Sequence, residues 1–170
     1  CLLSRGLGDV YKRQAVLRNA DSRGGSIAMH GLQQGVRLRI SEPRNLFPLQ
    51  HDAKRHLLMA GGIGITPILC MAERLSHTGG DFTLHYFARS AQQAAFVERL
   101  RQSPFADRVH LHFDDGEPGK RPDTAVLIGP ADPHTHLYVC GPGGFMEHVL
   151  GSARDLGWAN DNLHLSLIHI

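Results

Sequence analysis

The sequence lacks several features typical of secreted, metal-binding or membrane proteins. Its three cysteines, Cys1, Cys70 and Cys140, lie far apart and form neither a disulfide framework nor a C-x-x-C metal pair. We therefore expect a reducing, cytoplasmic setting. No apolar run approaches the roughly 20 residues of a membrane span. The net charge of +2 is too small to indicate a nucleic-acid partner or a membrane surface.

Histidine is abundant, but its pattern does not indicate a metal site. The 12 histidines are scattered, and their spacing does not match the usual zinc-ligand patterns. Some alternate along strand-like runs, as His110 and His112 do. The paired carboxyl groups of Asp114 and Asp115 could act as an acid–base pair. Because Gly116 follows them after a strand-like run, a turn is the more common meaning of this pattern.

Both ends of the chain resemble translated sequencing-adapter sequence. Residues 1–14 show no clear amphipathic period and lack the long apolar core of a signal peptide. Residues 165–170 look similar in origin. We therefore expect a natural protein that is longer at both ends, and no functional meaning for Cys1. The alternative is a disordered start and a genuine last strand.

The centre of the sequence predicts a strand, a glycine turn and a helix. Residues 55–59 are apolar, residues 60–67 read AGGIGITP, and the apolar side chains that follow share one helix face. We expect Thr66 to cap this helix and Pro67 to take its first position. Glycines allow close backbone approach, and helix N-termini favour phosphate. Because proline replaces the third glycine of the usual dinucleotide fingerprint, an ordinary β–α turn stays an equal alternative.

A second glycine turn follows a later apolar strand. Residues 137–140 are apolar, and residues 141–144 read GPGG before a helix with one apolar face. Gly157 is expected to close that helix, with Trp158 placed for the hydrophobic cap contact. The second turn thus repeats the logic of the first, with a proline near the start of a helix.

Strands and helices alternate between the two turns. Strands are expected over 82–87 and 109–113, and Ser90 with Gln93 forms a capping box for the intervening helix. Residues 125–128 fit either a helix or a strand. This alternation implies an α/β fold with a doubly wound parallel sheet, whose ligands bind at the carboxyl ends of the strands. Both glycine turns lie at such ends, so we expect them to face one crevice.

The residues before the connector at 50–54 read as β structure. Strand-like runs occur at 15–17 and 36–40. Between them, the run Arg23–Ser26 (RGGS) precedes a short helix and can present backbone N–H groups to a phosphate, with the arginine adding a charged contact. A plain turn is the alternative.

As a set, these motifs resemble the ferredoxin–NADP reductase superfamily, and within it the phthalate dioxygenase reductase and vanillate demethylase reductase group. The resemblance extends over about residues 16–164. Its matching runs are Arg23–Ser26 with Met29 and His30, Pro43–Asn45 with Phe47–Leu49, Ala60–Pro67, His85–Tyr86, Arg89–Ser90 with Ala95–Phe96, Leu137–Pro142 with Gly144–Met146, and Gly157–Trp158.

The resemblance implies an NAD(P)H-dependent flavin oxidoreductase in three parts. A flavin-binding antiparallel β-barrel precedes a nicotinamide-nucleotide domain and a plant-type [2Fe–2S] ferredoxin domain. Electrons pass from NADH or NADPH to FMN (or FAD), then to the cluster, and then to a partner Rieske-type aromatic-ring oxygenase or demethylase. The early barrel strands and the C-x₄-C-x₂-C motif are missing from this sequence. We therefore expect an inactive fragment, with the end of the barrel at 15–50 and the NAD(P) domain at 51–164.

The resemblance also implies roles for individual residues. The flavin phosphate is assigned to Arg23, Gly24, Gly25 and Ser26. The pyridine nucleotide is assigned to Gly61, Gly62, Gly64, Thr66, Pro67, Arg89, Ser90, Gly141 and Pro142. Cys140 is the expected catalytic residue beside the nicotinamide, where a small polarizable thiol can pack without forcing the ring away. A small buried residue that merely ends a strand is the alternative.

Cofactor choice and function both keep alternatives. An acidic residue about 20 residues past the glycine turn would hold the ribose 2′-hydroxyl of NAD. The sequence has Arg89 and Ser90 there, and arginine can accept the 2′-phosphate of NADPH. The family group commonly uses NADH, so the arguments conflict. A flavin-dependent reductase without an iron–sulfur domain, and a non-catalytic nucleotide-binding module, are the alternative functions.

Overall fold

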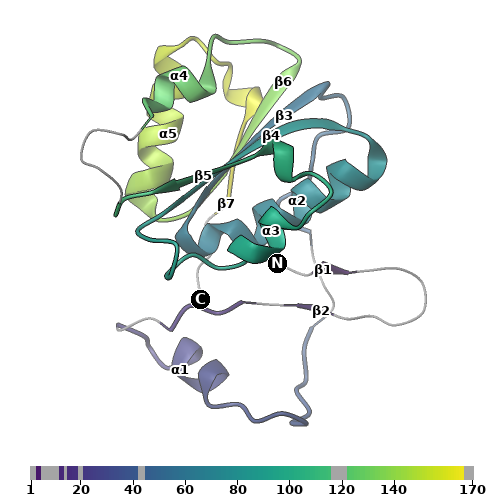
Figure 1. Cartoon of the computed structure of the whole chain (residues 1–170), viewed down its shortest axis with the longest axis vertical. Helices are drawn as coiled ribbons and strands as arrows, with labels where there is room; N and C mark the ends of the chain where they lie inside the picture. Colours follow the sequence, from purple (N-terminus) through teal and green to yellow (C-terminus); the bar gives the residue numbers. More distant parts are fainter. Residues whose placement is uncertain are drawn as a thin grey trace.

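The computed structural model describes residues 3–4, 12–13, 15–18, 21–41, 45–115 and 122–166. Its centre is a five-stranded parallel sheet with the order β5-β4-β3-β6-β7 (Figure 1). The order reverses between β3 and β6, which confirms the predicted doubly wound sheet. The strands are β3 (Arg55–Gly61), β4 (Asp81–Ala88), β5 (Val109–Phe113), β6 (Thr135–Cys140) and β7 (Leu163–Ser166).

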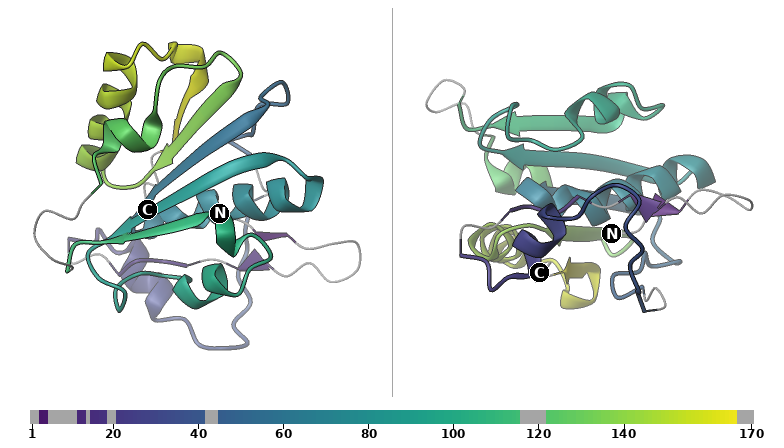
Figure 2. Two further views of the ribbon diagram at one scale, coloured as in Figure 1. Left: turned by 45° about the horizontal axis from the view of Figure 1, so that its top comes forward. Right: turned by 90° about the horizontal axis from the view of Figure 1, so that it is seen from below.

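Helices cover both faces of the sheet (Figures 1 and 2). α2 (Ile65–Thr78) and α3 (Val97–Arg101) contribute to a core on one face, and α4 (Thr124–Ile128) and α5 (Gly143–Asp155) contribute to a core on the other. β6 is buried along its whole length. Because both faces of the central strands are covered, these strands read in the sequence as continuous apolar runs.

Local capping hydrogen bonds shape the end of α5 and the segment at residues 125–128. Gly157 adopts a φ of 84°, and the backbone N–H of Trp158 donates to the carbonyl of Ala153 at 3.0 Å. The predicted cap is therefore confirmed. Residues 125–128 belong to the helix α4, because the side chain of Asp123 accepts the N–H of Ala125 at 2.9 Å and caps its start.

The start of α2 differs from the prediction. A 3₁₀ turn, η1 (Gly62–Gly64), leads into the helix, and Gly64 is the N-cap. Thr66 is thus the second helical residue, and its hydroxyl donates to the carbonyl of Ile63 at 3.1 Å instead of capping an N–H. Pro67 is third rather than first, which is still within the turn whose N–H groups have no partner inside the helix.

The segment after β4 also differs from the prediction. The hydroxyl of Ser90 accepts the N–H of Gln93 at 3.3 Å, but this contact forms an isolated turn. α3 begins only at Val97, after Phe96 with a φ of 62°. The phenol of Tyr86 accepts the N–H of Ala95 at 3.1 Å. A tertiary contact therefore holds this loop against the sheet where the capping box predicted a helix.

The two strand-like runs before the sheet do not form strands. Residues 15–17 and 36–40 have no regular secondary structure, and no described strand pairs with them. A strand needs a hydrogen-bonded neighbour, so alternation alone did not suffice. The short helix predicted between them is present as α1 (Gly25–His30). Figure 1 shows this part of the chain below the sheet.

The connector to the sheet is anchored on β6. The phenol of Tyr138 accepts the backbone N–H of Gln50 at 2.9 Å, and the ring of Phe47 lies 5.9 Å from the Tyr138 ring. Phe47 and Leu49 pack against the core that contains α2. The described part of the Pro43–Leu49 run therefore packs on the face of the sheet that α2 covers. Pro43 and Arg44 lie outside the described residues.

The remaining elements are short. β1 (Leu3–Ser4) pairs with β2 (Lys12–Arg13) in an antiparallel ladder. The 3₁₀ turns η2 (Ala106–Arg108) and η3 (Asn160–Asn162) lead into β5 and β7. β7 runs across the domain boundary expected after residue 164. Among the described residues, no helix has the length and apolar character needed to cross a membrane.

Candidate functional site

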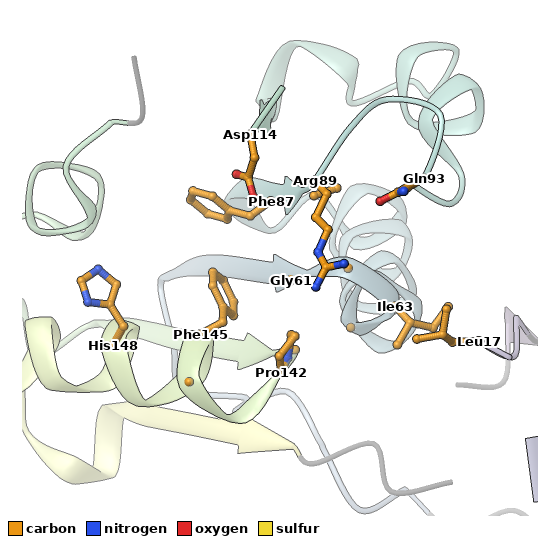
Figure 3. A pocket seen from close by; sticks show the side chains of 15 residues that line it. Leu17, Gly61, Ile63, Phe87, Arg89, Gln93, Asp114, Pro142, Phe145 and His148 are labelled. Atoms are coloured by element: carbon orange, nitrogen blue, oxygen red, sulfur yellow. The ribbon is translucent and has the colours of Figure 1, made fainter. Parts of the chain in front are cut away.

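A cavity of about 1030 Å³ opens at the carboxyl ends of β3 and β4 and beside the end of β6 (Figure 3). Both glycine turns line it: Gly61 ends β3 and Gly62–Gly64 follows it, while Gly141 with Pro142 follows β6. The prediction that the two turns face one crevice is confirmed. The cavity lies where the strand order reverses, which is the usual ligand position in such sheets, and its volume suits a large ligand.

Glycine is required where the two turns meet. A Cβ on Gly64 would lie 2.1 Å from the carbonyl oxygen of Cys140, so backbone packs directly on backbone. A Cβ on Gly61 would lie 2.8 Å from Cδ1 of Phe145, and one on Gly141 would lie 2.9 Å from the same atom. These contacts give a packing reason for glycine in both turns, at positions that are far apart in the sequence.

The glycines that face open space have a different role. Gly62 has a φ of 53°, and no atom would lie within 4 Å of a Cβ there or on Gly144. A ligand can therefore approach this backbone without meeting a side chain. α2 and α5 both start at the cavity, with Gly64 and Pro142 as their N-caps. Their free N–H groups and dipoles favour an anionic group between them.

An aromatic wall stands beside these helix starts. The rings of Phe87, from β4, and Phe145, from α5, lie 5.4 Å apart at an interplanar angle of 51°. The imidazole ring of His112 stacks on the ring of Phe87, and their centroids lie 4.5 Å apart. His148 lines the same side, and its Nε2 lies 3.0 Å from Oγ1 of Thr124. The wall offers flat apolar surface to a ring system.

A charged rim closes the cavity on the β4–β5 side. Arg89 follows β4 and Asp114 follows β5, and both line the cavity. The N–H of Asp114 donates to the carbonyl of Ala88, and the N–H of Asp115 donates to the carbonyl of Arg89, both at 3.1 Å. The strand ends therefore stay paired beyond the sheet. The aspartate pair forms the turn that the sequence favoured.

Cys140 ends β6 as a buried thiol. It has no solvent exposure, and its Sγ donates to the carbonyl of Ser166 at 3.1 Å. Burial raises the pKa of this thiol to about 11, so it is protonated at neutral pH. Its side chain belongs to the core on the α2 face, while Gly141 and Pro142 represent this strand end in the cavity lining. The thiol is therefore neither a nucleophile nor a proton acceptor at neutral pH.

The structure brings only some of the predicted nucleotide residues to the cavity. Gly61, Gly62, Gly64, Arg89, Gly141 and Pro142 line it, whereas Thr66 and Pro67 lie inside the first turn of α2. Ser90 forms the turn with Gln93. The sequence patterns did not assign Phe87, Asp114, Phe145 or His148 to this cavity, although they made Asp114 a candidate for an acid–base pair. Each follows or belongs to an ordinary strand or helix pattern, so no local signal separated them from core or turn residues.

The run assigned to flavin phosphate lies on a separate element. Gly24 is the N-cap of α1 with a φ of 108°, and Ser26 is buried. Nε2 of His30, at the other end of α1, lies 2.8 Å from the carbonyl oxygen of Val16. Leu17, next in the chain, lines the cavity. The run Arg23–Ser26 is therefore linked to the cavity through this neighbouring segment but does not line it.

Histidines pack as rings within the sheet. Nδ1 of His85 lies 3.1 Å from Nε2 of His112, and Nδ1 of His136 lies 2.8 Å from Nε2 of His164. Burial, with charge on His110 and His112, lowers the pKa of His85 to about 4. Across the described ranges, no three His, Cys, Asp or Glu side chains come together as a metal site requires.

These features define a nucleotide-binding domain of the ferredoxin reductase type. The chain belongs to the family described as dimethylamine monooxygenase subunit DmmA-like, N-terminal domain, whose model matches residues 39–163. The predicted membership of the ferredoxin reductase-like group is thereby confirmed.

Two similar proteins are named as an oxidoreductase and as a reductase subunit. The chain is 56% identical over 150 residues to a vanillate O-demethylase oxidoreductase of Pseudomonas sp. strain HR199, covering 88% of this chain and 47% of the relative. It is 44% identical over 151 residues to a carnitine monooxygenase reductase subunit of Escherichia coli, covering 88% of this chain and 46% of the relative. The chain thus spans about half the length of the curated relatives it matches.

Solved structures agree with this placement. A phthalate dioxygenase reductase, described as modular for electron transfer from pyridine nucleotides to [2Fe-2S], matches with a TM-score of 0.82 and 36% identity. That match covers 89% of this chain and 47% of the other. An intact type IV self-sufficient cytochrome P450 monooxygenase matches with a TM-score of 0.82 and 37% identity, covering 91% and 20%.

Proposed function

We propose that this chain is the nicotinamide-nucleotide part of an oxygenase reductase, an NAD(P)H-dependent flavin oxidoreductase. The observation that carries the proposal is the contact between the two glycine turns, where Gly64 packs on the backbone of Cys140 at the point of strand reversal. This contact builds a cavity with an anion-favouring floor and an aromatic wall. A dinucleotide needs both, because its pyrophosphate is anionic and its rings are flat.

The residues divide the work of binding. The starts of α2 and α5, with Gly62 and Gly144 open toward the ligand, hold the pyrophosphate, and Arg89 adds a charged contact. Gly141 and Pro142 lie beside the nicotinamide. Cys140 acts from behind them as a positioning residue, because its protonated thiol is packed in the core and sets where the strand end lies.

The residues assigned to the flavin phosphate lie on α1 and next to it, and they do not line the cavity. We propose that Arg23, Gly24, Gly25 and Ser26 hold the phosphate of FMN (or FAD), because Gly24, the N-cap of α1, is left-handed and makes no side-chain cap hydrogen bond. When bound, the flavin accepts a hydride from the nicotinamide and passes electrons one at a time to a [2Fe-2S] cluster, which we place in a domain after this chain.

The proposed partner is an oxygenase component. The named relatives serve a vanillate O-demethylase and a carnitine monooxygenase, and another is called a heme-dependent oxidative N-demethylase beta subunit. We propose that the partner is a Rieske-type aromatic-ring oxygenase or demethylase, because the vanillate O-demethylase oxidoreductase has the highest sequence identity to this chain among these three relatives. A cytoplasmic location is part of the proposal, because neither Cys70 nor Cys140 forms a disulfide in the described part of the chain.

Activity of the full-length protein tests the proposal. With saturating FMN and NADH or NADPH, the protein should reduce an artificial dye acceptor. If the protein shows no activity with NADH and none with NADPH, a non-catalytic nucleotide-binding module is favoured. Reading the gene beyond His164 separates the remaining alternative. Cysteines with C-x₄-C-x₂-C spacing support an iron–sulfur reductase, and a stop codon favours a flavin reductase without that domain.

A further inference from the structure

We infer that Asp114 receives the adenosine ribose hydroxyls of the nucleotide and makes this cavity select NADH over NADPH. This inference rests on the proposed nucleotide function of the same cavity. The sequence has no acidic residue directly after β4, where a ribose-binding carboxylate normally stands. The fold supplies one from β5, the neighbouring strand, at the same edge of the sheet.

Backbone pairing holds Asp114 at the cavity rim. The last residues of β4 and β5 are in register, with Ala88 opposite Phe113. The N–H of Asp114 donates to the carbonyl of Ala88, and the N–H of Asp115 donates to the carbonyl of Arg89. These bonds continue the ladder past the strands, so the position of Asp114 is set by the sheet. Both side chains are exposed, but of the two only Asp114 is among the described residues that line the cavity.

The side chains at this rim divide between two parts of a dinucleotide. In Figure 3, Arg89 extends from the end of β4 toward Gly61 and the first glycine turn, where the pyrophosphate would lie. Asp114 lies farther out, beside the ring of Phe87. A ribose follows the pyrophosphate in the adenosine half of the cofactor, so the carboxylate lies where the ribose hydroxyls arrive.

Charge decides which cofactor this arrangement accepts. The described residues that line the cavity include one arginine, Arg89, and one aspartate, Asp114, which carry opposite charges. A 2′-phosphate adds about −1.5 to −2 charge and needs surplus cations. A carboxylate repels it but accepts hydrogen bonds from a ribose diol. The site therefore combines an attraction for NADH with a repulsion of NADPH, which is how selective sites discriminate.

The test compares binding of NAD⁺ and NADP⁺ to the full-length protein by isothermal titration calorimetry. The unaltered protein should bind NAD⁺ at least about tenfold more tightly. In Asp114→Asn the preference should fall by about tenfold or more, mainly because NADP⁺ binds more tightly. Asp115→Asn is the matched control, since it removes the same charge one residue away, and it should leave the ratio within about twofold.

The outcomes distinguish the role of Asp114 from the proposed nucleotide function. A preference for NADP⁺ in the unaltered protein, or equal ratios in the two variants, overturns the role of Asp114 and leaves the proposed function standing. A folded protein that binds neither nucleotide overturns the proposed function as well. Circular dichroism checks folding. If Asp114→Asn does not fold, the ratio is measured on Asp114→Ser, for which the same change is expected.

Discussion

The sheet domain at residues 55–166 and the segment at residues 15–50 contain similar sequence signals but fold differently. Both have strand-like apolar runs and a glycine-rich run before a helix. In the sheet domain, each strand has a hydrogen-bonded neighbour and helices on its faces. In the earlier segment, Val36, Leu38 and Ile40 are 52%, 53% and 67% exposed and pair with no described strand. A strand-like sequence pattern forms a β-strand only where a neighbouring strand completes its backbone hydrogen bonds.

The same contrast separates the two glycine-rich runs. Gly61–Gly64 is enclosed by the second turn and by Phe145, and it starts a helix of 14 residues. Gly24 and Gly25 are exposed and start a helix of six residues. Tertiary packing thus fixes the backbone of the first run. Four predictions test this contrast, in decreasing order of the change that we expect.

The contact between the two turns should be the most sensitive point. We expect Gly64→Ala to lower the free energy of unfolding by more than about 3 kcal/mol, because its Cβ would overlap the backbone carbonyl of Cys140. Gly62→Ala is the matched control. It places a Cβ in open space and should cost only about 1 kcal/mol, from the left-handed backbone at φ 53°. Urea unfolding measures both, and equal losses would contradict the packing argument.

The buried histidines should make the sheet domain sensitive to acid. His85 titrates near 6.5 when unfolded and near 4 when folded, so the unfolded state binds more protons between these values. The contribution of His85 to the free energy of unfolding should therefore be constant above about pH 6.5 and fall by up to about 1.4 kcal/mol per pH unit toward pH 4. The lowered pKa values of His112, His136 and His164 act in the same direction.

Substitution separates His85 from the general effect of acid. His85→Gln should flatten the fall in stability between pH 6.5 and 4, as measured by urea unfolding at each pH. His77→Gln, at an exposed position in the last turn of α2, should leave the slope as it is. A slope that does not respond to His85→Gln would show that other groups control the acid response.

Cys140 should affect the reaction more than binding. Cys140→Ala removes a fully buried sulfur and should lower stability by about 1 kcal/mol. Nucleotide affinity should change less than about twofold, while flavin reduction in the full-length protein, followed by stopped flow, should slow by more than about tenfold, since small misplacements of reacting groups are costly. Unchanged flavin reduction would remove Cys140 from the mechanism.

The smallest effect is expected in the earlier segment. Leu38→Ser alters an exposed side chain that joins neither core, so the free energy of unfolding of this chain should change by less than about 0.5 kcal/mol. Leu58→Ser, in the core under α2, is the comparison and should cost several-fold more. A loss above about 1 kcal/mol for Leu38→Ser would mean that the two regions are not as different as the structure shows.

Much of the sheet domain was predictable from the sequence. Its strands are buried on both faces, so the apolar runs at 82–87 and 137–140 stand out without an alignment. The Gly157 cap is local chemistry and was also predictable. The predictions that turned out wrong, such as the start of α3 at Ser90 and the strands at 15–17 and 36–40, depended on residues distant in the sequence. Tyr86 holds the first segment as a loop, and no described strand pairs with the other two.

By itself, the sequence determined the order of strands, glycine turns and helices, because glycine, proline and apolar period act within a few residues. It also placed both glycine turns at strand ends. Only the tertiary structure decided that Gly64 packs on Cys140, that Phe87 and Phe145 form one wall, and that Asp114 shares a rim with Arg89. These pairs come from different βα units, and parallel sheet pairing brings them together at one edge.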